Sequence, residues 1–492
     1  MTAHLSDHER KVLAALPSGL LIGGEWGPAG GSRTFAVQDP ATEQEIARAA
    51  DATPDDARAA LDAAAGAQAQ WAASAPRDRG EILRRAYELM MERVDELALV
   101  MTLEMGKPLG ESRAEVAYSA DFFRWFSEEA VRAQGDYKVS TSGQNRVLVM
   151  RQPVGPCLLI TPWNFPAAMV ARKVGPAIAA GCTMVLKPPQ LTPLSSLAIA
   201  GILMEVGLPA GVLNVVTSSS ARSVTEPLLQ DGRLRKMSFT GSTEVGSSLM
   251  AGAAQHILRV SLELGGNAPF LVFEDAELEA AVEGALAAKM RNMGEACTAA
   301  NRFYVHSSLA AEFTERLAGA MGAMKVGRGT EPGVAVGPLI DGSQRQKVAD
   351  LVDEAVAKGA KVRCGGALPP GPGYFYEPTV LSDVPIDAEL SRTEIFGPVA
   401  PIFSFDDDQE ALDAANGTEF GLVAYAYTRD LSRAMKVAES LEVGMLGLNR
   451  GMVSDPAAPF GGVKESGMGR EGGDVGIDEY LEVKYVSIAK TW

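Results

Sequence analysis

Two different hydrophobic periodicities divide the chain. Between residues 54 and 134 apolar residues recur every three to four positions, in a segment rich in alanine, glutamate, arginine and leucine. This spacing predicts helices, one of which ends at Gly106-Lys107-Pro108, while another covers about 111–132. From Pro153 onwards, short continuous apolar runs alternate with helical segments instead. The pattern therefore predicts a helical segment followed by a region of alternating strands and helices.

The alternating region predicts a parallel sheet covered by helices. Continuous apolar strands that alternate with helices are typical of a doubly wound sheet, because such strands are covered on both faces. The expected strands cover 157–163, 183–188, 212–218 and 236–241, and each precedes a helix. A second series of the same kind begins near residue 257 and predicts a second α/β domain. Its helices are expected up to about 290, near 343–358, near 408–416 and near 431–440.

Two strand-like segments have no neighbour in either series. One covers residues 145–155, and the other is the alternating C-terminal segment EYLEVKYVSIAK. Because a strand needs a hydrogen-bonded neighbour, both segments must pair outside the two predicted sheets.

Charge and cysteine content exclude several classes of protein. The 492 residues carry 45 basic and 62 acidic side chains, a net charge of −17, which argues against nucleic-acid partners and against an anionic membrane surface. Four cysteines without CxxC spacing favour neither a disulfide framework nor a metal site. The first residues lack the apolar core of a signal peptide, and no apolar run reaches the ~18 residues of a transmembrane helix. We therefore expect a cytoplasmic protein without a metal.

Two glycine motifs suggest phosphate binding, and one of them lacks the right context. The segment GMGREG (467–472) matches GxGxxG but follows a loop rather than a strand, so we interpret it as a structural glycine loop. The better candidate is FTGSTEVG, where Gly241 and Gly246 flank a predicted strand-to-helix turn. The free N–H groups of such a helix N-terminus favour a phosphate.

Three polar residues are candidates for catalysis. The thiol of Cys297 in GEACTAANR is a nucleophile once ionised, although a lone cysteine is more often a small buried residue. Glu263 in LELGGN stands among apolar residues and glycines, which favours a general base, or alternatively a capping or ion-paired carboxylate. Asn164 in TPWNFP follows a strand, where its amide suits an oxyanion or a turn.

Taken together, the motifs resemble those of the NAD(P)-dependent aldehyde dehydrogenases. The resemblance runs from GGEW (23–26) to the C-terminal strand and implies an α/β fold, with a Rossmann-type cofactor domain, an α/β catalytic domain and a small β oligomerisation element. The expected boundaries are 1–134 and 152–262 for the cofactor domain, 263–460 for the catalytic domain, and 135–151 and 475–492 for the oligomerisation strands. It also implies a homodimer or homotetramer. The motifs occur in the order TPWNFP, MVLKPPQLTP, FTGSTEVG, LELGGN, GEACTAANR, EIFGPV and PFGGVKESGMGREG.

The resemblance also implies roles for individual residues. Cys297 would be the nucleophile, Glu263 the base that activates water, and Asn164 the oxyanion donor together with the N–H of Cys297. The product of aldehyde oxidation would then be a carboxylic acid released from a thioester. Residues that would bind NAD or NADP are Lys187 at the adenosine ribose, Gly241 and Ser242 at the pyrophosphate, Glu394 at the nicotinamide ribose, and Trp163, Leu264 and Phe396 along the cleft.

The similarity is greatest to the succinate-semialdehyde dehydrogenases within this family. Arg172, Arg291 and Ser454 match that subfamily's site for the substrate carboxylate, and Phe460, six residues after Ser454, is also expected to bind the substrate. A carboxylate at the end of a short chain favours a bidentate guanidinium. Arg172 lies in an apolar segment and needs a partner there, which could equally be a carboxylate of the protein.

Two positions depart from patterns within the family. Ala299 stands where some members have a second cysteine, so their redox disulfide is not expected here. Gln190 stands where NAD-preferring members often have a glutamate that repels a 2′-phosphate, so either cofactor is possible and NADP is favoured.

The sequence leaves other functions open. The substrate could be another semialdehyde, or an aliphatic or aromatic aldehyde. A cysteine hydrolase would need a histidine base, and the only histidines, His4, His8, His256 and His306, lie in no recognisable motif.

Overall fold

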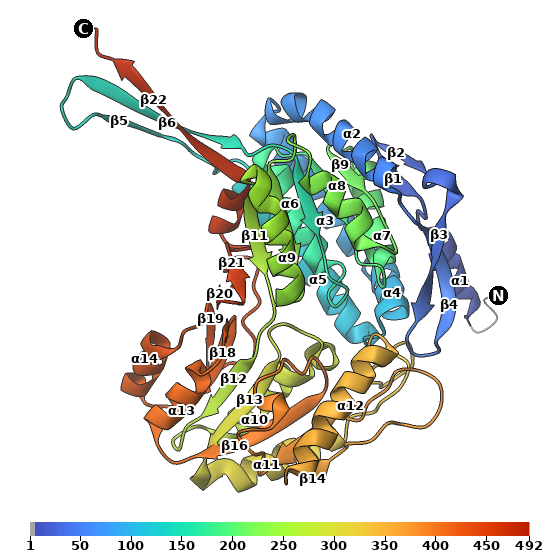
Figure 1. Ribbon diagram of the computed structural model, residues 1–492, viewed down its shortest axis with the longest axis vertical. Helices are drawn as coiled ribbons and strands as arrows, with labels where there is room; N and C mark the ends of the chain where they lie inside the picture. The colour runs from blue at the N-terminus through green and yellow to red at the C-terminus, as the bar shows by residue number, and fades with distance from the viewer. Residues whose placement is uncertain (1–4, 492) are drawn as a thin grey trace.

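Two mainly parallel sheets form the body of the molecule, and a three-stranded antiparallel sheet projects away from it (Figure 1). The computed structural model describes residues 5–491. The first four residues of the expected cofactor domain, which include His4, and Trp492 at the end of the expected oligomerisation strand lie outside the described residues. The α/β class predicted from the sequence is confirmed.

The first sheet contains the strands predicted between 157 and 241. Its order is β2-β1-β9-β8-β7-β10-β11-β21, and the run from β9 to β11 is parallel. The parallel strands β7, β8, β9 and β10 are fully buried, as their continuous apolar sequences require. The strand bounds are β1 Leu20–Ile22, β2 Glu25–Gly27, β7 Cys157–Ile160, β8 Met184–Lys187, β9 Leu213–Val215, β10 Lys236–Thr240, β11 Arg259–Glu263 and β21 Gly467–Met468.

Helices cover both faces of this sheet (Figure 1). The α4 helix ends at Gly106, whose φ of 97° is a left-handed C-cap, so the predicted stop is confirmed. Gly175 of α6 lets the rings of Phe123 and Phe126 in α5 approach closely, because a Cβ at Gly175 would stand 3.2 Å from Phe126. The helices are α2 Pro54–Ala72, α3 Pro76–Glu92, α4 Val94–Met105, α5 Leu109–Glu129, α6 Ala168–Ala180, α7 Pro193–Glu205, α8 Ala221–Leu229 and α9 Thr243–Ala253.

The N-terminal segment contains elements that the sequence pattern did not predict. Helix α1 (Asp7–Ala14) begins with a capping box between Ser6 and Glu9. Strands β3 (Thr34–Asp39) and β4 (Gln44–Ala50) pair as an antiparallel hairpin.

The second sheet belongs to the series that begins near 257. Its order is β14-β15-β16-β13-β12-β18-β19, and all neighbours are parallel except β14 and β15. Helix α11, which follows β13 without a loop, was not predicted. The strands are β12 Ala268–Val272, β13 Ala300–His306, β14 Lys361–Cys364, β15 Thr379–Ser382, β16 Val399–Phe405, β18 Val423–Tyr427 and β19 Met445–Leu448. The helices are α10 Leu278–Met290, α11 Ser307–Gly322, α12 Gly342–Ala357, α13 Asp408–Asn416 and α14 Leu431–Ser440.

The GxGxxG segment packs against the first sheet as backbone. The short strand β21 pairs antiparallel with the end of β11, and a Cβ at Gly467 would stand 2.0 Å from the carbonyl oxygen of Leu262. The glycine therefore serves close backbone packing here. Two further short strands, β17 (Phe420–Gly421) and β20 (Val463–Lys464), pair nearby.

The two strands without predicted neighbours pair with each other. Strand β22 (Leu481–Ala489) pairs antiparallel with β6 (Asn145–Pro153) along its whole length, and β5 (Asp136–Val139) pairs with the other edge of β6. This arm extends away from the two domains (Figure 1). Its exposed apolar side chains are Tyr137, Val139, Met150, Val483, Tyr485 and Ile488.

Across residues 5–491, no helix is both long and apolar enough to cross a membrane. The same residues contain no group of three histidine, cysteine or acidic side chains arranged to hold a metal ion.

Candidate active site

The carboxyl ends of two strands in the first sheet and the turn before β13 of the second sheet bring the predicted catalytic residues to one cavity. Asn164 follows β7, Glu263 ends β11, and Cys297 lies in the turn before β13. All three line a cavity of about 220 Å³. Ligands of parallel α/β sheets bind at this edge, where the strands end and the connecting loops begin. Trp163, Gly241, Ser242, Leu264, Glu394 and Phe396, all predicted for the cofactor, line the same cavity.

Burial and two nearby carboxyl groups raise the pKa of the Cys297 thiol, and two nearby arginines lower it. Burial raises its pKa to about 12, and the positive charges of Arg172 and Arg291 oppose this rise. Glu394 and Glu263 raise the pKa further because a second negative charge is unfavourable beside a thiolate. The thiol is therefore protonated at neutral pH in the free protein, and the two arginines favour the ionised form that attacks a carbonyl.

Glu263 is a buried carboxyl without a full set of partners. Its side chain is 3% exposed, and Oε2 has no hydrogen bond. Burial and the nearby charge of Glu471 raise its pKa well above the usual range. A Cβ at Gly461 would stand 2.8 Å from Oε1, so glycine leaves the space that the carboxyl occupies. A carboxylate of raised pKa accepts a proton readily, as a general base must.

Two hydrogen bonds fix the amide of Asn164. Its Oδ1 accepts from the N–H of Phe165 at 3.1 Å, and its Nδ2 donates to the carbonyl of Glu295 at 3.0 Å. Because Nδ2 carries two hydrogens, the second N–H remains for a group in the cavity. The carbonyl of Asn164 accepts from the buried Lys107 at 2.7 Å, and Lys107 in turn pairs with Glu115.

Groups suited to a dinucleotide are also found at the end of β8, although Lys187 and Gln190 are not among the residues that line the cavity. Lys187 ends β8 with its side chain 5% exposed, and burial lowers its pKa to about 8. Its ammonium has no carboxylate partner among residues 5–491, so it is free to bind ribose hydroxyls or phosphate. Ser242 caps the N-terminus of α9, accepting from the N–H of Val245 at 3.4 Å. Gln190 is exposed just beyond β8. These residues fit the expected NAD or NADP.

Two residues of the cleft were not predicted from the sequence. Gln344 and Lys347 lie one helical turn apart in α12 and line the cavity with Cys297. Gln344 donates to the carbonyl of Phe396 at 2.7 Å, and Lys347 donates to that of Glu394 at 2.8 Å. They therefore hold the loop that carries both predicted cofactor residues. The only sequence signal was the spacing of three between two polar residues at the start of a helix.

Glu394 contacts the segment that connects β11 of the first sheet with β12 of the second. Its Oε1 accepts from the N–H of Gly266 at 3.2 Å. Burial raises its pKa to about 7, while the charges of Lys347 and Lys289 act in the opposite direction. A partly ionised carboxyl of this kind accepts hydrogen bonds from sugar hydroxyls.

A second cavity, of about 590 Å³, contains Arg291 and Ser454. The consecutive residues Asn164 and Phe165 line the first and the second cavity, and the charge of Arg291 acts on the Cys297 thiol, so the two cavities lie near each other. Arg291 donates to Ser454 Oγ at 3.1 Å, and its guanidinium lies 4.7 Å from the centre of the Phe165 ring. No carboxylate of the described chain forms an ion pair with Arg291. The cavity therefore offers a guanidinium to an anionic ligand.

Arg172 has a different environment from Arg291. Its Nη2 lies 2.7 Å from Oε2 of Glu471, and its guanidinium lies 3.8 Å from the centre of the Phe460 ring. Lys173 contacts the same carboxylate at 2.6 Å. Neither Arg172 nor Phe460 lines the two cavities described above. The structure thus shows the partner that the sequence left open, a carboxylate of the protein.

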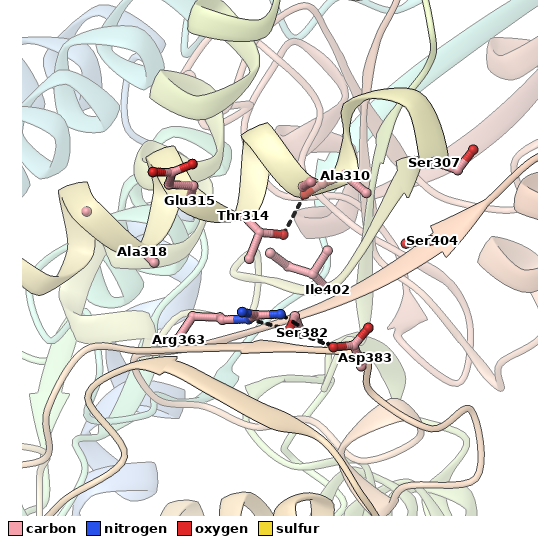
Figure 2. A pocket seen from close by; sticks show the side chains of 12 residues that line it. Ser307, Ala310, Thr314, Glu315, Ala318, Arg363, Ser382, Asp383, Ile402 and Ser404 are labelled. Atoms are coloured by element: carbon pink, nitrogen blue, oxygen red, sulfur yellow. Dashed lines mark hydrogen bonds and ion pairs between the residues drawn. The ribbon is translucent and has the colours of Figure 1, made fainter.

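A third cavity, of about 660 Å³, lies away from these residues, between α11 and the strands β14 to β16 (Figure 2). Its polar groups bond to one another: Arg363 donates to Ser382 at 2.6 Å, and Thr314 donates to the carbonyl of Ala310 at 2.6 Å. None of the predicted site residues lines it.

The histidines do not support a cysteine hydrolase. His8, His256 and His306 are absent from the lining of the Cys297 cavity. His256 contacts the carbonyl of Gln230 at 3.1 Å, and His306 contacts Ser308 at 2.8 Å. Within residues 5–491, no imidazole stands where it could ionise the thiol.

A family model, two relatives and a solved structure are similar to this chain over most of its length. A family model described as the aldehyde dehydrogenase family matches residues 26–486. A succinate-semialdehyde dehydrogenase of Paenarthrobacter nicotinovorans is 61% identical over 444 residues, which is 90% of this chain and 99% of that protein. An NADP-dependent succinate-semialdehyde dehydrogenase of Escherichia coli K12 is 50% identical over 95% of this chain and 97% of its own. The crystal structure of an E. coli NADP-dependent enzyme superposes with a TM-score of 0.96 at 48% identity, covering 99% of this chain and all of that one.

Proposed function

This chain belongs to the aldehyde dehydrogenase family, whose members oxidise aldehydes to carboxylic acids with NAD or NADP, and we propose that its substrate is succinate semialdehyde. The observation that carries the proposal is Arg291, a guanidinium without an acidic partner in a cavity next to the predicted nucleophile. A short aldehyde with a carboxylate at its other end joins these two sites.

The proposed reaction begins at Cys297. Its thiolate adds to the aldehyde carbon, and the oxygen becomes negatively charged beside the free N–H of Asn164. NAD or NADP, when bound in the cleft, supplies a hydride acceptor, so that the adduct on Cys297 becomes a thioester. Glu263 then takes a proton from water, whose oxygen adds to the thioester carbonyl. The C–S bond breaks, and the acid leaves while the thiolate is restored.

The remote carboxylate would bind to Arg291 and Ser454. Arg291 presents further N–H groups beside the one bonded to Ser454, and charge-assisted bonds to a carboxylate are stronger than neutral ones. Arg172 and Phe460 do not line the two cavities, so they would act indirectly. The charge of Arg172 favours the Cys297 thiolate, and Phe460 packs against the guanidinium of Arg172.

The cofactor would contact Lys187 and Gln190 through its adenosine ribose. Gln190 is neutral, so it does not repel a 2′-phosphate as a carboxylate at that position would. The proposal therefore keeps both NAD and NADP and favours NADP. Gly241, Ser242 and the start of α9 would hold the pyrophosphate, and Glu394 the nicotinamide ribose.

We also propose a division of labour along the chain. Residues 1–134 and 152–262 would bind the cofactor, residues 263–460 would carry catalysis, and residues 135–151 and 475–492 would join subunits. The apolar side chains exposed on the β5-β6-β22 arm support a homodimer or homotetramer. The free cysteines suit the cytoplasm. Light scattering after gel filtration gives the subunit number, and a monomer would contradict the proposal.

Steady-state kinetics on a matched panel test the substrate. The panel contains succinate semialdehyde, glutarate semialdehyde, butanal and benzaldehyde, each with NAD and with NADP, and uses Cys297→Ala as the blank. Succinate semialdehyde should give the highest kcat/KM, and butanal, of equal chain length but without the carboxylate, should be at least tenfold poorer. Equal values for these two would overturn the substrate assignment, and a higher value for glutarate semialdehyde would correct the chain length.

A further inference from the structure

The turn that leads to the nucleophile has an unusual backbone. Asn292, Met293 and Gly294 have φ angles of 55°, 55° and 78°, so three consecutive residues are left-handed. Glycine adopts this conformation freely and asparagine tolerates it, but methionine does not favour it. Such a turn persists only where its surroundings hold it in place. The contacts that hold it therefore also decide where Cys297 stands, three residues further on.

The side chain of Asn292 supplies these contacts from a fully buried position. Its Nδ2 donates to the carbonyl of Asn164 at 2.9 Å and to that of Glu295 at 2.9 Å. Asn164 in turn donates to the same Glu295 carbonyl at 3.0 Å. The amide of Asn292 thus connects the strand end that carries Asn164 with the turn that carries Cys297.

The orientation of this amide is determined by its neighbours. Both of the facing groups are carbonyl oxygens, which only accept hydrogen bonds, so they require the NH₂ end of the amide. The reversed amide would place three oxygens together. The N–H of Asn292 is bonded as well, to Glu111 at 2.6 Å. Lys107 also donates to the carbonyl of Asn164, but its hydrogen bonds go to Asn164 and Glu115 and not to the turn.

We propose that Asn292 is a positioning residue that sets the distance between the two donors of the oxyanion site, the Asn164 amide and the Cys297 N–H. The inference rests on the proposed function, since it assigns those two groups to the oxyanion. Asn292 itself does not touch substrate. Its removal leaves the thiol itself available for reaction but lets the two donors move apart, and displacement of such groups by about 1 Å reduces rates up to 10²-fold.

Two thiol reagents separate this role from a general structural one. An activated ester, p-nitrophenyl acetate, acylates Cys297 through a tetrahedral oxyanion. Iodoacetamide alkylates the same thiol by displacement at carbon, without an oxyanion. Neither reaction needs the cofactor. In Asn292→Gly, the glycine suits the left-handed backbone, so only the bridging amide is lost. We expect acylation to slow by about 10- to 100-fold, while alkylation stays within about threefold.

The matched control is Asn449→Gly. Asn449 is also left-handed, with a φ of 51°, and its side chain also bonds to backbone, donating to the carbonyl of Thr428 at 2.9 Å. This variant should be acylated and alkylated at the parent rates. A second variant, Asn292→Asp, keeps the shape of the side chain but turns an oxygen toward the two carbonyls. It should also lose acylation selectively, and it decides the question if the glycine variant does not fold.

The inference is overturned if Asn292→Gly is acylated at the parent rate, or if acylation and alkylation fall equally. An equal loss of acylation in Asn449→Gly would also overturn the inference. It would show that removing any asparagine side chain bonded to backbone at a left-handed position has the same effect. A different result tests the underlying function: if the parent is acylated no faster than Cys297→Ala, then Cys297 is not the nucleophile and the inference fails with it.

Discussion

Arg172 and Glu471 form an ion pair of 2.7 Å that is almost completely shielded from water, with side chains 2% and 7% exposed. The pair shares its carboxylate with Lys173, so two cations surround one anion in the interior. Burial of charges is unfavourable unless they are paired, so the loss of one partner from such a buried cluster is destabilising. The pair therefore predicts a role in folding for Arg172 that Arg291 does not share.

Replacing Arg172 with alanine should destabilise the protein. Breaking an isolated buried pair costs about 3–5 kcal/mol. Lys173 still contacts Glu471 after the substitution, so the loss should not exceed that range, and the thermal midpoint of unfolding should fall. Arg172→Lys, which keeps the charge, should lose less. Residual activity should fall alike for succinate semialdehyde and butanal. If the midpoint is unchanged and only the KM for succinate semialdehyde rises, then the guanidinium binds the substrate carboxylate instead.

Replacing Arg291 with alanine should affect one class of substrate. Loss of a charge-assisted hydrogen bond costs about 1.5–3 kcal/mol, which corresponds to a rise in KM for succinate semialdehyde of roughly ten- to over a hundredfold. Butanal makes no such contact, so its kcat/KM should stay near the parent value. Arg291→Lys should restore only part of the loss, because an ammonium cannot reproduce the fork of a guanidinium. Ser454→Ala should cost less, about 0.5–1.5 kcal/mol for a neutral hydrogen bond. Equal damage to both aldehydes would remove Arg291 from the substrate site.

The buried strands were the most predictable part of the fold. Their apolar residues are continuous because helices cover both faces, and this pattern is visible without any tertiary information. Helix α11 was missed because it starts where β13 ends: the His306 side chain accepts from the N–H of Ser308 and caps the helix, so no loop marks the boundary. The alternation in β6 and β22 indicated strands, but not that they pair with each other.

The candidate site also has a part that was predictable from the sequence and a part that was not. The presence of Cys297, Glu263 and Asn164 in one cavity was predictable because each lies in a short motif that resembles a motif of the family. Gln344 and Lys347 were not, since they reach the cavity only through the packing of α12 beside the loop with Glu394. The partner of Lys173 lies 298 positions away in the chain. Sequence alone shows that a buried cation needs an anion, but it does not show which one.

The reactivity of Cys297 should increase with pH well beyond the neutral range. A thiol whose pKa is about 12 is mostly protonated at pH 7, and its thiolate fraction grows about tenfold per pH unit below that pKa. The rate of alkylation by iodoacetamide in the absence of cofactor should therefore rise about tenfold per unit between pH 7 and 9.5. Cys297→Ala measures the contribution of the other cysteines. A plateau below pH 9 would show that the thiol ionises more easily than its burial indicates.

Replacing Gln190 with glutamate should shift the cofactor preference toward NAD. A carboxylate beside the 2′-phosphate of NADP adds repulsion between like charges, and it accepts hydrogen bonds from the ribose hydroxyls of NAD. The ratio of kcat/KM for NAD to that for NADP should increase by about tenfold or more. Gln190→Ala separates loss of the amide from gain of the charge and should change the ratio less. If the ratio stays constant in both variants, position 190 does not face the ribose.

Replacing Glu263 with glutamine should separate the two halves of the reaction. Glutamine keeps the size of the side chain but cannot accept a proton from water, so hydrolysis of the thioester should slow by roughly 10²–10⁴-fold. Formation of the thioester does not need that proton acceptor, since Cys297 and Asn164 remain in place. Mixing the variant with aldehyde and NAD(P) should therefore give a burst of about one equivalent of reduced cofactor per active site, followed by a slow steady state. Cys297→Ala should show neither phase, and Glu263→Asp, whose carboxylate is one methylene shorter, should retain more steady-state turnover than Glu263→Gln. Turnover of Glu263→Gln at the parent rate would mean that another group activates the water, and the absence of a burst together with slow turnover would place Glu263 in the first half of the reaction instead.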